Sequence, residues 1–250
     1  MIQGATTATL CLLICGCVQN VTFPDADEQR RSFLDRVNEG YNLVDVYESG
    51  LSKTLGVFAS NDCSDIYVDG DSYRRTLDAK DEKGIGSGAV IVGGKFVVTA
   101  LHLTEGSKVF CVLGRGENAD FRSLARPYWC SRNADLAILR LAERSPHSFD
   151  WSARVLVGDV AWTIGIVSPV GGFVTSVGEV NDTASVPVES SLRLTFGDSG
   201  SPLISEAGEL MAVNTKALAK RRWSPSIDST LSQRPADKIR KGEIEANCER

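Results

Sequence analysis

The chain has 250 residues, of which 42% are hydrophobic and 24% charged, and its formal net charge is −5. That length and composition allow a sizeable core in one large domain or two small ones. The acidic balance and the lack of a basic stripe exclude nucleic acid as an expected partner. The short basic cluster at residues 220–222 is interpreted as a solvated loop.

The N-terminus has the features of an export signal. The first seventeen residues contain no charged side chain, and the apolar run Leu10–Cys15 is too short to span a bilayer. Residues 14–17, Ile-Cys-Gly-Cys, resemble a bacterial lipobox, although no Lys or Arg precedes them. We therefore predict a lipoprotein-type signal peptide at residues 1–16 and lipidation of Cys17. The alternative is a buried N-terminal strand or helix.

The cysteines are consistent with export. Seven are present, and removal of the signal together with lipidation of Cys17 leaves four. An even number suits an oxidising compartment, and four cysteines allow three pairings. We favour Cys111 with Cys130, which lie close in sequence, and Cys63 with Cys248, which would connect the tail to the front. The alternative is four buried thiols.

The stretch that follows the signal is predicted to contain one short helix. Asp25 can cap a helix from about Ala26 to Asn38, and Gly40 would end it. Residues 63–83 are charged and poor in apolar side chains, so a loop is expected there.

From Gly86 onward the sequence consists mainly of short runs that are typical of β-strands. Short runs such as KFVVTAL, LAILRLA and ELMAVNT are separated by Gly, Asn, Asp or Ser, which is typical of a sandwich or barrel. Gly93-Gly94 is expected to turn a hairpin. GIGSGA at 84–89 leads into a strand and not a helix, so a dinucleotide-binding loop is not predicted. A further short helix is expected near 236–241.

Three residues along this β region could form a nucleophilic site. Ser199 lies in TFGDSGSPL, and a serine nucleophile needs a base because its hydroxyl is barely ionised at neutral pH. Only two histidines exist; His102 directly follows a predicted strand, whereas His147 lies in a proline-flanked loop. Asp135 precedes the apolar strand LAILRL, where a partly desolvated carboxylate could orient an imidazole.

These motifs carry a family resemblance. VVTALH, ADLAILRL and GDSGSPL resemble the histidine, aspartate and serine blocks of chymotrypsin-like (trypsin-like) serine proteases of bacterial type, in that family's order. The resemblance covers about residues 55–218. It implies an all-β fold of two six-stranded antiparallel β-barrels of the chymotrypsin type, here with a short N-terminal helix.

The resemblance also implies a role for each residue. Ser199 would attack the scissile carbonyl, His102 would act as general base, and Asp135 would orient His102. The backbone N–H groups of Gly197 and Ser199 would form the oxyanion hole. In digestive relatives a new N-terminus pairs with the aspartate before the nucleophile, here Asp198; its partner is left open.

Other hydrolase classes are disfavoured. GDSL-type esterases and α/β-hydrolases both place a histidine after the nucleophile, and none follows Ser199. No cluster of His, Cys and Asp has metal-ligand spacing, so neither a metal nor another cofactor is predicted. Two alternatives stay open: a weak or inactive binding module on the same fold, and a Deg-like quality-control protease of the cell envelope.

Substrate preference is predicted by counting from the nucleophile along the family pattern. Arg193 corresponds to the base of the primary specificity pocket, and Asn214, Thr215 and Lys216 to the strand that walls it. Two cations beside the pocket favour an acidic side chain on the acyl side of the cut bond. Asn214 could also hydrogen-bond Asp135.

The sequence thus predicts an exported, lipid-anchored serine endopeptidase of protein or peptide substrates. It would comprise a signal peptide at 1–16, a linker and helix at 17–54, and a protease domain at 55–250. The two barrels would divide near 145–155.

Overall fold

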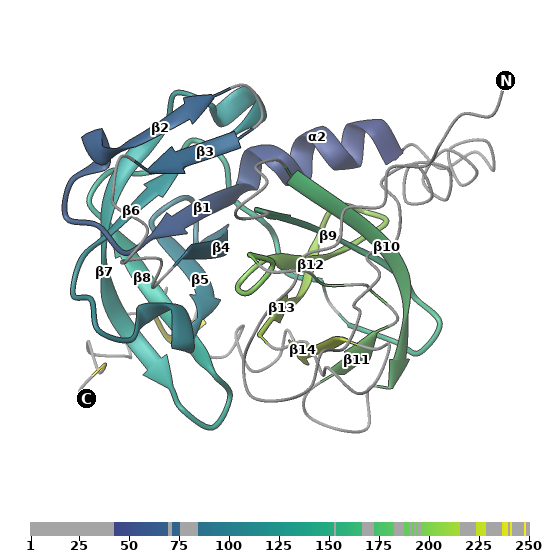
Figure 1. Ribbon diagram of the computed structural model, residues 1–250. Helices are drawn as coiled ribbons and strands as arrows, with labels where there is room; N and C mark the ends of the chain where they lie inside the picture. Colours follow the sequence, from purple (N-terminus) through teal and green to yellow (C-terminus); the bar gives the residue numbers. More distant parts are fainter. Residues whose placement is uncertain are drawn as a thin grey trace, which may run out of the picture.

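Two groups of antiparallel strands lie side by side in the computed structural model, and helix α2 (Leu43–Lys53) runs across the top of the view in Figure 1. The structure describes residues 43–69, 72–75, 85–152, 154–166, 173–182, 188–190, 192, 194, 197–215, 224–228, 237–239, 241 and 248.

The first group is a closed antiparallel barrel in the order β1-β4-β5-β8-β7-β6. Its strands are β1 (Thr54–Phe58), β4 (Ile85–Ile91), β5 (Phe96–Ala100), β6 (Phe110–Leu113), β7 (Arg122–Ser131) and β8 (Leu136–Leu141). Successive side chains of a strand point to opposite faces. On β5, Val97 therefore packs with Leu55 and Phe110 inside the barrel, whereas Phe96 and Val98 belong to a second cluster.

The other six strands pair antiparallel in the closed order β10-β11-β14-β13-β12-β9. They are β9 (Val160–Ile166), β10 (Phe173–Asp182), β11 (Val188–Ser190), β12 (Pro202–Ser205), β13 (Leu210–Asn214) and β14 (Ser224–Asp228). Ile164, Ile204 and Val213 pack in the same cluster as Phe96 and Val98, so this cluster is an apolar core shared by the two groups. An all-β chain with a closed six-stranded antiparallel barrel and a short N-terminal helix was predicted and is confirmed.

Helix α2 was not anticipated at its observed position. Val46, Tyr47 and Leu51 pack against the shared core, which stabilises a helix too short to persist alone. Gly50 lets the helix come close, because a Cβ there would lie 3.0 Å from the side-chain methyl groups of Ile164 and Ile204. The predicted helix at 26–38 lies outside the described residues. A helical turn at 237–239 falls within the C-terminal helix that was expected.

Two further local predictions have different outcomes. Strands β4 and β5 pair antiparallel around Gly93 and Gly94, both with positive φ, so the predicted hairpin is confirmed. The prediction of a loop over residues 63–83 is wrong in part, because β2 (Ile66–Asp69) and β3 (Ser72–Arg75) form a two-stranded hairpin. Ile66 is fully buried against the barrel, and this contact holds a polar segment in strand form.

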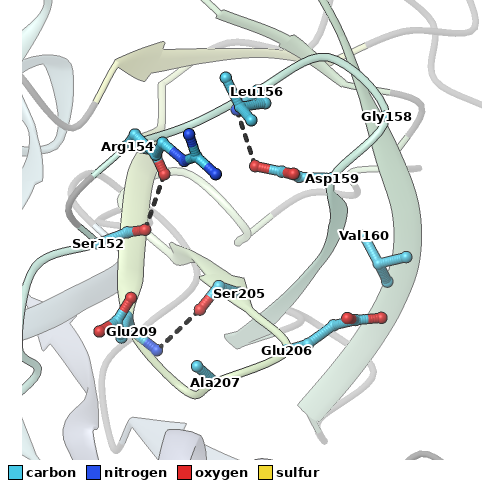
Figure 2. Close-up of a pocket in the computed structure, with 10 residues that line it drawn as sticks. All are labelled: Ser152, Arg154, Leu156, Gly158, Asp159, Val160, Ser205, Glu206, Ala207 and Glu209. Carbon is cyan, nitrogen blue, oxygen red and sulfur yellow. Dashed lines mark hydrogen bonds between the residues drawn. The ribbon is translucent and has the colours of Figure 1, made fainter.

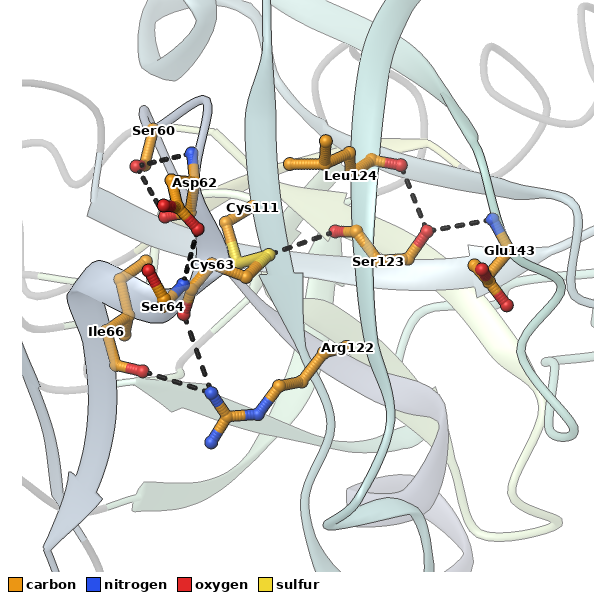
Figure 3. Close-up of a disulfide and its surroundings, with 10 residues drawn as sticks. All are labelled: Ser60, Asp62, Cys63, Ser64, Ile66, Cys111, Arg122, Ser123, Leu124 and Glu143. Carbon is orange, nitrogen blue, oxygen red and sulfur yellow. Dashed lines mark hydrogen bonds between the residues drawn. A yellow bond between two sulfur atoms is a disulfide. The ribbon is translucent and has the colours of Figure 1, made fainter.

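The four predicted disulfide cysteines are all bonded, but the predicted pairing is wrong. The disulfides join Cys63 to Cys111, shown in Figure 3, and Cys130 to Cys248. Cys111 lies opposite Leu124 in the β6–β7 ladder. Cys130 lies six residues after Leu124 on β7, which places it about 20 Å along the strand from the position opposite Cys111. A disulfide needs Cα atoms within about 7 Å, and those of Cys63 and Cys111 are 5.2 Å apart.

The short 3-10 turn η1 (Cys63–Asp65) that carries Cys63 is held by polar contacts on both sides (Figure 3). The Asp62 side chain caps it by accepting the backbone N–H of Ser64 at 2.8 Å, and this hydrogen bond lowers the pKa of Asp62. The Arg122 guanidinium donates to the carbonyls of Cys63 and Ile66, at 3.5 and 3.3 Å. The disulfide therefore ties an already ordered turn to the barrel.

The structure does not describe the N-terminal segment for which an export signal was predicted. The predicted signal peptide at 1–16 and the predicted lipidation at Cys17 lie outside the described residues. Among the helices that the structure does describe, none has both the length and the apolar character needed to cross a membrane.

Candidate active site

His102 lies just after β5, the third strand of the first barrel in chain order. Strand β5 runs into the 3-10 turn η2 (Leu101–Thr104), which begins where the backbone N–H of Leu101 donates to the carbonyl of Asp135 at 2.8 Å. Leu103 and Thr104, the last two residues of this turn, are buried and so hold it in place. The imidazole of His102 keeps 38% of its surface exposed and is accessible to a substrate.

Asp135 holds His102 through two hydrogen bonds. Its Oδ1 accepts the backbone N–H of His102 at 3.0 Å, and its Oδ2 lies 2.9 Å from the imidazole Nδ1. Because an ionised carboxylate only accepts, Nδ1 must carry the hydrogen, which leaves Nε2 free to accept a proton. Asp135 directly precedes β8 and has φ +50°. This left-handed backbone conformation is uncommon outside glycine.

Every carbonyl of the Gly197–Ser199 segment accepts a hydrogen bond. Asp198 O accepts from the N–H and the hydroxyl of Ser201, at 2.9 and 2.6 Å. Gly197 O and Ser199 O accept from Ser87, at 3.0 and 2.8 Å. Gly197 and Asp198 are buried, whereas Ser199 is partly exposed. The turn is thus rigid, and its serine is accessible.

Ser87 is the site residue that sequence reasoning missed. It lies in GIGSGA, the motif considered only as a dinucleotide-binding loop. The signal available was the pair of glycines that flank it, because glycines on a buried strand often mark the close approach of another backbone.

The predicted pocket residues are only partly described. Asn214 is fully buried, and its amide donates to the hydroxyls of Thr163 and Ser201 at 2.8 and 2.9 Å. Thr215 is also buried. Arg193 and Lys216 lie outside the described residues. The structure therefore places Asn214 behind the Ser199 turn, where it supports Ser201.

A cavity of about 530 Å³ lies in the second group of strands, and Figure 2 shows it. It is lined by the loop before β9 and by the β12–β13 turn, and includes Arg154, Asp159, Glu206 and Glu209. Asp159 is engaged locally, since it accepts the backbone N–H of Leu156 at 2.8 Å. None of the three predicted catalytic residues lines this cavity.

His147, the second histidine, lies in the loop between β8 and β9, where its backbone hydrogen-bonds the hydroxyl of Ser145. Within the described part of the chain, no group of His, Cys, Asp and Glu could hold a metal ion. The chemistry that the His102–Asp135 pair can support is proton transfer at Nε2 of His102.

Comparisons with known proteins identify a family and a fold for this chain. The family model of the trypsin-like peptidase domain matches residues 86–213. Two proteins of Synechocystis sp. are similar over 150 residues: "Putative serine protease HhoA", 26% identical over 53% of this chain and 36% of that protein, and "Putative serine protease HhoB", 27% identical over 54% and 35%. The matched stretch thus spans about a third of each relative.

One solved structure extends the likeness to about three quarters of the chain. The serine endoprotease from Yersinia pestis superposes with a TM-score of 0.61 at 17% identity, covering 78% of this chain and 66% of that one.

Proposed function

The chain belongs to the trypsin-like (chymotrypsin-like) serine protease family, and from this premise we propose that it is an endopeptidase that cuts peptide bonds through an acyl-enzyme on Ser199. The observation that carries the proposal is the double hydrogen bond between Asp135 and His102, at 3.0 and 2.9 Å. That arrangement leaves the imidazole as an acceptor at Nε2, which is the form that a general base requires.

The proposed reaction has two halves. The Ser199 Oγ attacks the scissile carbonyl carbon while its proton passes to Nε2 of His102, and the tetrahedral oxyanion is stabilised by the N–H groups of Gly197 and Ser199. The proton then moves from His102 to the leaving amine as the C–N bond breaks. Water, deprotonated by His102, releases the acyl group and restores the serine. Asp135 stabilises the imidazolium in both halves.

The proposal includes a division of the chain. The protease domain would extend over residues 55–250, with β9 to β14 as the second barrel of the chymotrypsin type. The boundary between the barrels, proposed near 145–155, falls between the end of β8 at Leu141 and the start of β9 at Val160.

Covalent labelling tests the proposal. A fluorophosphonate probe should react with the folded protein at Ser199, because only an activated serine attacks such a phosphorus centre. Failure of the wild-type protein to react would favour the alternative function, a binding module on the same fold. Degradation of unfolded but not folded proteins would support the Deg-like role.

We expect a preference for Glu or Asp on the acyl side of the cut bond. Arg193 and Lys216 would supply cations beside the pocket, and a guanidinium matches a carboxylate bidentately. A peptide library measures this: Arg193→Ala should lower kcat/KM for Glu substrates about tenfold while other substrates are spared.

The matched control is Arg140→Ala, which removes an exposed arginine of β8. This variant should cut the library as the wild-type protein does. Cleavage mainly after Lys, Arg or large apolar residues would contradict the acidic preference and would indicate that Arg193 points away from the pocket.

We also propose that the mature protein is exported and attached to a membrane by a lipid on Cys17, with no other membrane contact. A single lipid-modified cysteine gives membrane association without a spanning helix. Cys17→Ser should abolish lipid incorporation and move the protein from the membrane fraction to the soluble one. A mature N-terminus at any other residue would refute this anchor.

A further inference from the structure

Ser87 lies where strand β4 of the first barrel meets the Ser199 turn of the second group of strands. Its side chain is fully buried, and β4 is one of the strands that encloses the first barrel. A buried hydroxyl must be hydrogen-bonded or it destabilises the fold. Its partners therefore show what this serine does.

The hydroxyl of Ser87 donates to the carbonyl of Gly197 at 3.0 Å, and its backbone N–H donates to the carbonyl of Ser199 at 2.8 Å. One residue thus holds the carbonyl on each side of the Asp198–Ser199 peptide. The N–H of that peptide is one of the two proposed oxyanion donors. Its direction depends on the backbone that Ser87 holds at both ends.

Ser87 is connected to the histidine as well. Its own carbonyl accepts the hydroxyl of Thr99 at 2.6 Å, and Thr99 is a fully buried residue of β5, the strand that leads to His102. The β5 strand, Ser87 and the Ser199 turn therefore form one continuous set of hydrogen bonds across the two groups of strands.

Glycine is required on both sides of this contact. A Cβ on Gly86 would lie 2.8 Å from the carbonyl oxygen of Ser199, and a Cβ on Gly200 would collide with the carbonyl of Ser87 and the hydroxyl of Thr99. Only such a close approach lets a side chain as short as serine reach the Gly197 carbonyl. Gly197 itself has φ +98°, a region that only glycine enters readily. Because glycine has no side chain to restrict its φ and ψ angles, outside contacts must fix the orientation of its peptide groups.

We propose that Ser87 is a positioning residue for the oxyanion hole: its hydroxyl fixes the Gly197 carbonyl and so keeps the N–H groups of Gly197 and Ser199 directed at the substrate carbonyl. The inference rests on the proposed function, since it assumes that Ser199 is the nucleophile. Among the three carbonyls of the turn, that of Gly197 is held by a side chain from a distant strand, 110 residues away, and can be released by one substitution.

The test is Ser87→Ala, which removes the hydroxyl and leaves the backbone N–H bond to Ser199. Removing an oxyanion donor outright lowers kcat about 10²–10³-fold, so loosening one should lower it about 10–100-fold. KM should stay within about threefold, because ground-state binding does not use the hole. Inhibition by a peptide aldehyde, which forms a tetrahedral adduct, should weaken in parallel with kcat.

Ser52→Ala is the matched control. Ser52 is likewise buried, with 2% of its surface exposed, and its hydroxyl donates to one backbone carbonyl, that of Ser49 at 2.9 Å, but it lies in α2. Both variants should lower Tm similarly, while Ser52→Ala keeps the wild-type kcat. If Ser87→Ala does not fold, Ser87→Cys replaces the hydroxyl with a thiol, which is somewhat larger and a weaker donor, and kcat should fall again.

The outcomes separate the two proposals. An active wild-type protein whose kcat changes less than twofold in the Ser87 variant would overturn the positioning role alone. An equal loss of kcat in the Ser52 variant would do the same, because a general effect of destabilisation would then explain both. A wild-type protein that neither hydrolyses peptides nor reacts with fluorophosphonate would overturn the proposed function and this inference with it.

Discussion

Ser199→Ala is expected to abolish peptide hydrolysis and fluorophosphonate labelling. The change removes the oxygen that would form the acyl-enzyme, so only binding and the oxyanion hole would remain. In serine proteases this lowers kcat about 10⁶-fold, leaving about 10³–10⁴-fold catalysis over the reaction in water. Both kcat and the amount of covalent adduct measure the effect, with the modified residue identified by peptide mass spectrometry.

The fold should survive this change, because the described hydrogen bonds of the turn use the backbone of Ser199. Ser205→Ala is the control, since Ser205 lies at the other end of β12 and, among the described residues, its hydroxyl accepts only a local backbone N–H, that of Glu209. It should retain wild-type activity and labelling. Labelling that persists in the Ser199 variant would refute the assignment of the nucleophile.

Asp135→Asn should lower kcat about 10⁴-fold while the protein stays folded; the magnitude is that of the same change in a digestive relative. In the wild-type protein the backbone N–H of His102 donates to Oδ1 of Asp135 at 3.0 Å. The direction of this N–H is fixed, so in the variant it must donate to the amide oxygen of the asparagine. The NH₂ group then faces Nδ1, which must become an acceptor. The hydrogen moves to Nε2, and the base can no longer take a proton from Ser199.

A second aspartate in a loop provides the control. Asp159 also accepts a backbone N–H, that of Leu156, and it does not contact His102. Asp159→Asn should leave kcat unchanged. Steady-state kcat and the second-order rate of fluorophosphonate labelling should fall together in the Asp135 variant; a loss of less than tenfold in both would show that Asp135 does not set the tautomer.

The strands and the three candidate residues could be predicted because each depends on local sequence. Runs of apolar β-formers between turn residues predicted the strands, and Gly93-Gly94 predicted the β4–β5 hairpin that the structure contains. Each of His102, Asp135 and Ser199 stands beside such a run. The pairing of His102 with Asp135 was expected from the position of Asp135 before an apolar strand and from the family resemblance, and the structure places their side chains 2.9 Å apart.

The disulfide pairing could not be predicted from sequence distance. Cys111 and Cys130 are close along the chain, but the β6–β7 register separates them. Cys63 reaches Cys111 because β1 pairs with β6 and sets Phe58 opposite Cys111, five residues before Cys63. Helix α2 was missed for a similar reason: its stability comes from packing on a core built by strands that follow it.

The sequence by itself determined most strands of the two groups, the family and the candidate residues, because these follow from hydrophobic period, turn chemistry and short motifs. Only the tertiary structure decided which distant residues meet. Ser87 and Gly197 are 110 residues apart, and nothing local to either indicates the bond between them. It forms because barrel closure brings β4 against the Ser199 turn, where glycines at 86 and 200 leave no side chain between the two backbones.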